Sequence, residues 1–64
     1  MSNVWLAVDK DGSELIFGEE KPIRERNQWT DREDLYFWVQ VPQGTIEKLI
    51  GYKLTWNDEP IELK

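Results

Sequence analysis

Neighbouring carboxylates are the residues of this chain best suited to acid–base chemistry. They occur as Glu19-Glu20, Glu33-Asp34 and Asp58-Glu59. Two carboxylates can act as general acid and general base when burial drives their pKa values apart. A chain of 64 residues leaves little room for a concave, desolvated pocket, and adjacent acids in polar runs usually form a solvated surface. The sequence therefore predicts that the protein is not an enzyme and has no catalytic residue.

The segment DKDGSE, from Asp9 to Glu14, has the composition of a calcium loop. The EF-hand pattern puts its invariant glycine at the sixth position, whereas Gly12 is the fourth residue when counted from Asp9. A hairpin turn accounts for this segment better. The chain also lacks Cys and His, which removes the usual zinc ligands and the commonest general base. We expect no metal and no cofactor.

A tryptophan and four basic residues gather in the polar middle of the chain, at Lys21, Arg24, Arg26, Trp29 and Arg32. Binders of single-stranded nucleic acid combine basic and aromatic side chains in this way. Acidic residues interleave with the basic ones, and the whole chain carries a net charge of −5, which opposes binding to a phosphate backbone. The sequence predicts a solvated loop of mixed charge and no direct contact with nucleic acid.

The length and composition indicate one small folded domain, residues 1–64. A chain of this size buries only about 60% of the surface that its unfolded form exposes, so each large apolar residue matters. Four Trp, two Tyr and two Phe are too many for a disordered acidic tail. No apolar run reaches the length of a membrane span, and the first residues lack the basic and apolar regions of a signal peptide. A cytoplasmic location is expected.

The first sixteen or so residues predict a β-hairpin. Two alternating apolar runs flank Asp11-Gly12, a pair that suits a two-residue turn. This turn would pair Val8 with Leu15 and Trp5 with Gly18. One face of the hairpin would then carry Val4, Leu6, Val8, Leu15 and Phe17, and the other would carry Trp5, Ala7 and Ile16.

The middle of the chain predicts a long polar segment followed by a strand. Pro22 ends the second strand or confines its continuation to a sheet edge. Trp29 either anchors the polar segment to the core, which we favour, or is an exposed contact residue. The segment LYFWVQV, residues 35–41, is the strongest strand pattern, with Leu35, Phe37, Val39 and Val41 on one face and Tyr36, Trp38 and Gln40 on the other.

The last third predicts a short helix and an extended tail. Thr45 suits the N-cap, Gly51 suits the position after the last turn, and the stripe between them is Ile46, Leu49 and Ile50. KLTW is expected to be a short strand, NDEP a turn, and IEL a final extended piece. The predicted fold is α+β, a small antiparallel sheet in the order β-β-β-α-β, and a small all-β barrel is the alternative.

Both faces of this sheet carry large apolar side chains, and one short helix cannot cover them. We expect LTWNDEPIEL to return over the sheet, with Trp56 packed against it. If this tail joins the helix on one face, Trp5, Tyr36 and Trp38 remain as an aromatic patch on the other. A patch of this kind, rimmed by charge, suits a partner or a second copy of the chain.

The segments VWLAVDKDG, KPIR and LTWNDEPIEL, in this order and spacing, resemble those of short uncharacterised proteins of bacteriophages and mobile elements of gut bacteria. The resemblance covers most of the chain outside Glu25 to Asp34. It implies a cytoplasmic bacterial setting and an accessory role, and it carries over no activity and no catalytic residue.

Two functions fit the sequence. The first is a protein–protein interaction module, as a possible homodimer or with another protein, that uses Trp38, Tyr36, Trp29 and Trp5 as anchors, since Trp and Tyr dominate interface hot spots. The second is an acidic decoy of phage type that mimics nucleic acid and blocks a host enzyme. The acids are dispersed along the chain, which favours the interaction module. Neither function involves a membrane.

Overall fold

The computed structural model describes residues 4–18, 20–31 and 38–63. Its elements, in chain order, are β1 (Val4–Val8), β2 (Glu14–Gly18), β3 (Ile23–Glu25), β4 (Gln28–Thr30), β5 (Trp38–Val41), α1 (Thr45–Ile50) and β6 (Ile61–Leu63). Leu35, Tyr36 and Phe37 of the predicted third strand lie outside the described residues. In the part that the structure describes, no helix is long and apolar enough to cross a bilayer.

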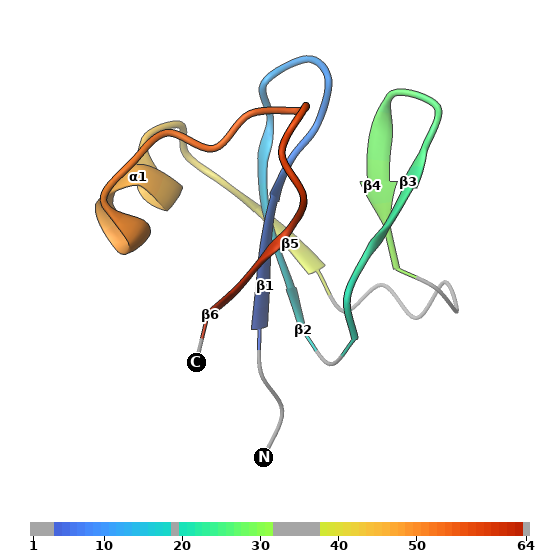
Figure 1. The fold of residues 1–64 in the computed structure, drawn as a ribbon, viewed down its shortest axis with the longest axis horizontal. Coiled ribbons are helices and arrows are strands. Elements are labelled where there is room, and N and C mark those ends of the chain that lie inside the picture. Colours follow the sequence, from blue (N-terminus) through green and yellow to red (C-terminus); the bar gives the residue numbers. More distant parts are fainter. Residues whose placement is uncertain (1–3, 19, 32–37, 64) are drawn as a thin grey trace.

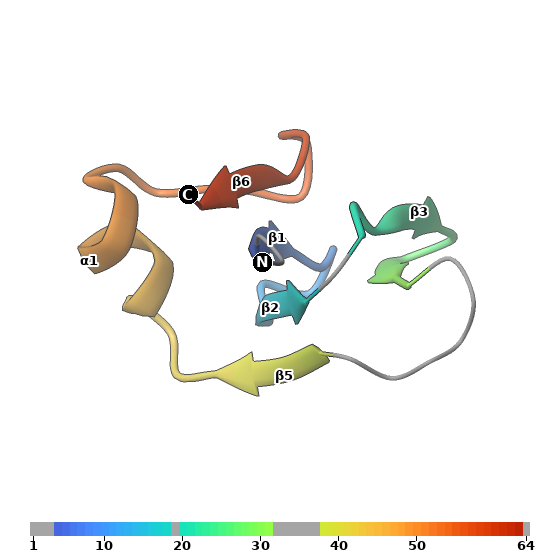
Figure 2. The ribbon, with the colours of Figure 1, turned by 90° about the horizontal axis from the view of Figure 1, so that it is seen from below.

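The described strands form an open antiparallel sheet and a separate hairpin (Figure 1). The sheet has four strands in the order β5-β2-β1-β6, and β3 pairs only with β4. Helix α1 lies on one side of the sheet and the β3–β4 hairpin lies on the other (Figure 2). The predicted α+β class is confirmed, and the sheet is not closed into a barrel.

The register of the first hairpin differs from the prediction by one residue. Leu6 faces Ile16 and Trp5 faces Phe17, because the loop spans five residues rather than the two of Asp11-Gly12. Within the loop, the Asp9 N–H donates to the Ser13 carbonyl at 2.9 Å. Since side chains alternate along a strand, this one-residue slip exchanges the two faces of β2. Ile16 therefore lies on the helix side, and Leu15 and Phe17 lie on the hairpin side.

Each face of the sheet has its own apolar cluster. On the helix side the buried residues are Leu6, Val8, Ile46 and Leu54, flanked by Ile16, Ile50, Ile61 and Leu63. On the hairpin side they are Ala7, Leu15, Phe17 and Trp29, flanked by Trp5 and Trp56. The sheet is thus the middle of three layers, and both faces are covered within one chain.

Helix α1 begins differently from the prediction. Gly44, with φ 94°, is the N-cap residue, and the Thr45 hydroxyl instead donates to the Pro42 carbonyl at 2.6 Å. The C-terminal prediction is confirmed, since Gly51 has φ 88° and its N–H donates to the Glu47 carbonyl. Of the predicted stripe, Ile46 is buried and Ile50 packs on the cluster, whereas Leu49 points outward and is exposed. A helix of six residues presents only a narrow buried face.

The C-terminal segment reaches both faces of the sheet. Leu54 lies in the helix-side cluster, Trp56 packs on the hairpin-side cluster, and β6 pairs with β1. The predicted strand at residues 53–56 is wrong, because these residues cross the sheet rather than pair with it. The turn is closed by Asp58, whose carboxylate accepts the Thr55 N–H at 2.9 Å. The segment is therefore held at three places along its length.

Candidate functional site

Strand β5 is an edge of the sheet. It pairs with β2 on one side, and no described strand lies on its other side (Figure 2). Trp38, Val39 and Gln40 are all exposed, with 56% of Val39 accessible to solvent. The strand WVQV carries no charged residue. Natural proteins usually protect open edges with charge, a bulge or a covering element, so an uncharged exposed edge suits association with another chain.

Trp38 ends a row of aromatic side chains on the hairpin side of the sheet. Trp5 faces Phe17 across the first hairpin, and Phe17 faces Trp38 across the next strand pair. The Phe17 and Trp38 ring centroids are 6.2 Å apart, while Phe17 is fully buried and Trp38 is 42% exposed. One part of the Trp38 ring is thus fixed by packing and the rest faces solvent. A rigid, half-exposed tryptophan is typical of an interface anchor.

A groove of about 430 Å³ separates the β3–β4 hairpin from β2 and β5. We call it the β5 groove, and its lining residues are Asp9, Asp11, Ser13, Leu15, Glu25, Gln28, Trp29, Thr30, Trp38 and Gln40. The charged residues in this lining are all carboxylates. The basic residues of the neighbouring turns, Lys10 and Arg26, are not part of it. The described lining of the groove is therefore negatively charged, with an aromatic wall at the β5 edge.

Two of these carboxylates have pKa values displaced in opposite directions. Burial raises the pKa of Asp9, an effect that the hydrogen bond from the Trp29 N–H opposes and the charge of Asp11 reinforces. The pKa of Asp11 is lowered, chiefly because its carboxylate accepts the Ser13 N–H at 2.9 Å. The Asp9 carboxylate is thus hydrogen-bonded to the β3–β4 hairpin, whereas Asp11 presents an ionised carboxylate to solvent.

The wall of the groove opposite β5 is the β3–β4 hairpin, which the sequence did not predict. Its contacts with the β1–β2 loop hold it in place: the Trp29 N–H donates to Asp9 Oδ1 at 2.8 Å, and Trp29 Nε1 donates to the Val8 carbonyl at 3.0 Å. The Lys10 N–H also donates to the Asn27 carbonyl. Trp29 is only 5% exposed, so the prediction that it anchors the polar middle to the core is confirmed.

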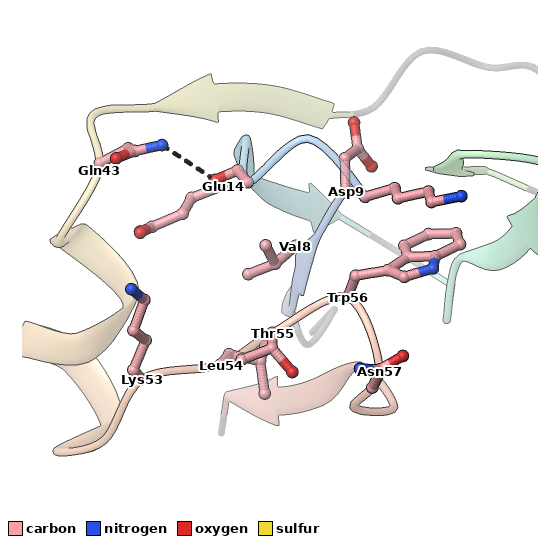
Figure 3. A pocket seen from close by; sticks show the side chains of 11 residues that line it. Val8, Asp9, Glu14, Gln43, Lys53, Leu54, Thr55, Trp56 and Asn57 are labelled. Carbon is pink, nitrogen blue, oxygen red and sulfur yellow. Dashed lines mark hydrogen bonds between the residues drawn. The ribbon is translucent and has the colours of Figure 1, made fainter.

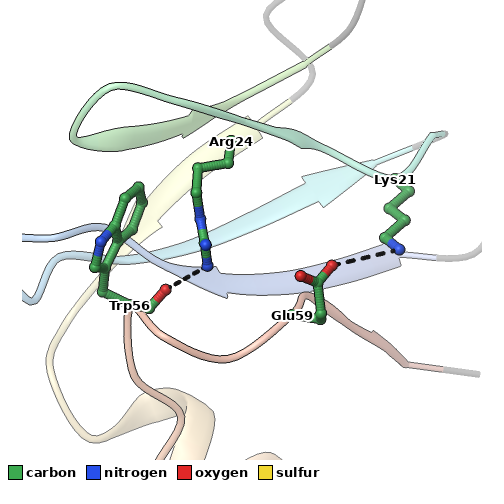
Figure 4. A network of polar contacts seen from close by, with 4 residues as sticks. All are labelled: Lys21, Arg24, Trp56 and Glu59. Atoms are coloured by element: carbon green, nitrogen blue, oxygen red, sulfur yellow. Dashed lines mark hydrogen bonds and ion pairs between the residues drawn. The ribbon is translucent and has the colours of Figure 1, made fainter.

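An arginine joins the outer side of the hairpin to the C-terminal segment (Figure 4). The Arg24 guanidinium carbon lies 4.7 Å from the Trp29 ring centroid and 4.5 Å from that of Trp56. Arg24 Nη2 donates to the Trp56 carbonyl at 2.7 Å, and Lys21 Nζ lies 3.7 Å from Glu59 Oε1. Two basic residues of the predicted solvated loop therefore serve to attach the tail.

A second cavity, of about 350 Å³, lies between the β1–β2 loop and the segment that follows α1 (Figure 3). Val8, Leu54 and Trp56 supply its apolar part, and Lys53 and Asn57 stand at its edge. Gln43 Nε2 donates to the Gly12 carbonyl at 3.3 Å and narrows one end. The cavity does not include any exposed residue of β5.

The four predicted anchor residues have different positions. Trp38 is exposed on the edge strand, Trp29 is buried with its ring in the groove wall, and Trp5 is half-buried with Lys21 Nζ 6.0 Å above its ring. Tyr36 lies outside the described residues. Sequence reasoning missed the carboxylates Asp9, Asp11 and Glu25 as a group. Asp9 and Asp11 come from the β1–β2 loop and Glu25 from the end of β3, and no local pattern connects them.

Comparison with known proteins adds no relative. No family model matches the chain, and neither a curated protein nor a solved structure matches it. The likeness to short proteins of phages and mobile elements stays a prediction. Among the described residues, no group of three or more Asp or Glu side chains is placed to hold a metal ion.

Proposed function

We propose that this protein is a small accessory module that binds another protein and carries out no catalysis. The exposed, uncharged edge of β5 with Trp38 beside a groove is the observation that supports this function most strongly. A strand edge offers main-chain hydrogen bonds, and a fixed aromatic ring offers apolar contact at low entropic cost.

Apart from Tyr52, which is 50% exposed, the other aromatic side chains of the described residues pack at least partly inside the fold. Trp29 and Trp56 contact each other with ring centroids 5.8 Å apart, and Phe17 is fully buried. The apolar clusters on both faces of the described sheet are thus packed by side chains of the same chain. Trp38 is the tryptophan of the described residues with the most solvent-exposed ring, and we assign it the role of principal contact.

Selection from a display library of random peptides tests this function. The immobilised protein is expected to enrich peptides whose binding weakens only moderately with salt, and Trp38→Ala is expected to lose them. Leu49→Ala is the matched control, because Leu49 is equally exposed but lies on α1. Circular dichroism of each variant checks that the fold is kept, and Trp38→Phe, which preserves contact with Phe17, should retain part of the binding.

The acidic decoy gives the opposite result in this experiment. Its binding would fall steeply with salt and would survive Trp38→Ala, since carboxylates rather than the ring would make the contacts. That outcome, or enrichment that neither variant alters, would overturn the interaction module.

A further inference from the structure

The two edges of the sheet differ in how they are protected. A proline lies next to each edge strand, Pro60 before β6 and Pro42 after β5. Strand β6 has three residues and carries Glu62, whereas β5 has four residues without charge, and its only described neighbour is β2. Charged side chains on an edge strand keep other strands away from it. Their absence from Trp38–Val41 marks β5 as the edge better able to accept another strand.

A strand added beside β5 would present alternate side chains to the two faces of the sheet. On the helix side its neighbours would be Val39, which is 56% exposed, and Val41. On the hairpin side its neighbours would be Trp38 and Gln40, which line the β5 groove. Directly opposite and diagonal side chains are close enough across paired strands to interact. The two faces therefore require different chemistry of the incoming strand.

The helix side requires apolar side chains and the hairpin side requires basic ones. Val39 and Val41 offer apolar surface, which a β-branched residue would cover. The groove beside Trp38 has carboxylates of Asp9, Asp11 and Glu25 and no basic residue in its described lining. A guanidinium in this position could stack on the Trp38 ring and pair with a carboxylate.

We propose that the partner binds as an added strand next to β5, and that this strand alternates apolar residues toward α1 with Arg or Lys residues in the β5 groove. This inference rests on the proposed function and names its mode of binding and the chemistry of its partner. Main-chain hydrogen bonds to β5 supply affinity, and the alternation selects the sequence.

The experiment is an NMR titration of the ¹⁵N-labelled protein with three end-blocked peptides. The first is Thr-Val-Arg-Val-Arg-Val-Thr. The second has Glu in place of each Arg, and the third has the same composition as the first with its two Arg residues adjacent, which destroys the alternation. The third peptide controls for general attraction to a chain of net charge −5.

We expect the alternating Arg peptide to shift the amide signals of residues 38–41 and to slow their hydrogen exchange. Its dissociation constant should be at least about tenfold lower than that of either control, and Asp11→Asn should weaken binding by about three- to tenfold. Glu47→Gln is the matched charge control, because Glu47 is exposed on α1. It should leave the binding unchanged.

Three results of the titration would overturn the inference. They are equal binding of the Arg and scrambled peptides, signal changes confined to residues away from β5, and no binding of any of the three. Protection of residues 38–41 that rises with protein concentration in the absence of peptide would also overturn it, since the occupant would then be a second copy. Enrichment of Trp38-dependent peptides in the display experiment together with failure here would reject the added strand and keep the proposed function.

Discussion

Glu14 shows how one side chain can connect two elements. It stands at the start of β2, is only 9% exposed, and accepts the Gly44 N–H at 2.8 Å and the Ile46 N–H at 2.9 Å through its two carboxylate oxygens. These donors belong to the first turn of α1, where N–H groups lack partners within the helix. Glu14 therefore performs from a neighbouring strand the role that Thr45 was expected to perform locally.

Replacing Glu14 with Gln should destabilise the protein although the shape of the side chain is kept. An amide has one acceptor oxygen, so one of the two N–H groups would face another donor. We expect the free energy of unfolding to fall by about 1–3 kcal/mol, the cost of an unsatisfied buried donor. Urea denaturation measures this change, with Glu20→Gln at an exposed position as the control. Equal stability of the two variants would show that the cap contributes nothing.

Asp9 couples protonation to folding. Burial raises its pKa above 3.8, so the folded chain retains this proton at pH values where the unfolded chain has lost it. The contribution of Asp9 to the free energy of unfolding therefore falls as pH rises through the window between 3.8 and its higher folded value. Asp11 has the opposite sign, since its pKa is lowered and its contribution is lost as pH falls below 3.8.

Asp9→Asn should remove the loss of stability that Asp9 causes as pH rises. The amide keeps an oxygen that can accept the Trp29 N–H. From about pH 3 to about pH 6, the free energy of unfolding of the variant is expected to rise relative to that of the wild type. Asp11→Asn should change in the other direction, chiefly at pH values below 3.8. Thermal unfolding at a series of pH values measures both. A parallel pH profile for the wild type and Asp9→Asn would contradict the account.

At the scale of the elements, the C-terminal segment depends on a contact between residues that are far apart in the sequence. Trp56 meets Trp29 at a ring-centroid distance of 5.8 Å, and Arg24 lies close to both rings. Trp56 is half-buried, so only part of its indole surface is removed from water. This edge-to-face contact joins the β3–β4 hairpin to the segment that leads into β6.

Trp56→Ala should loosen both segments together. We expect a loss of about 2 kcal/mol, less than the roughly 3–5 kcal/mol typical of a fully buried aromatic residue. Amide exchange should accelerate in residues 23–30 as well as in residues 54–63. Trp38→Ala is the control of the same type, and its loss should be smaller because Trp38 is an exposed edge residue. Faster exchange in residues 54–63 alone would mean that the β3–β4 hairpin does not depend on its contact with Trp56.

The sequence predicted those elements whose residues are organised locally. The alternation of side chains between two faces predicted β1, β2 and β5, and Gly51 predicted the end of α1. Both signals lie in residues that are neighbours in the sequence. The predicted register of the first hairpin is wrong because the Asp11 carboxylate accepts the Ser13 N–H and the loop has five residues. The β3–β4 hairpin and the β5 groove escaped prediction because contacts of Trp29 with Val8 and Asp9, about twenty residues away, create them.

At the scale of the whole molecule, an apolar cluster lies on each face of the described sheet, and we propose the β5 edge of this sheet as the place for association. Sixty-four residues fold into layers of helix, sheet and hairpin, and the exposed apolar side chains of the described sheet are Trp38 and Val39. A net charge of −5 opposes close approach of two identical copies, whereas it attracts a basic segment. We therefore propose that the β5 edge binds a different protein rather than a second copy.

The solution mass tests this claim most directly, by light scattering after size-exclusion chromatography over a wide concentration range. The account predicts a monomer of 7.7 kDa at every concentration, with the β5 edge unoccupied. A mass near twice this value, restored to the monomer by Val39→Lys and unaffected by Leu49→Lys, would contradict it, because the edge would already be occupied by the chain's own copy.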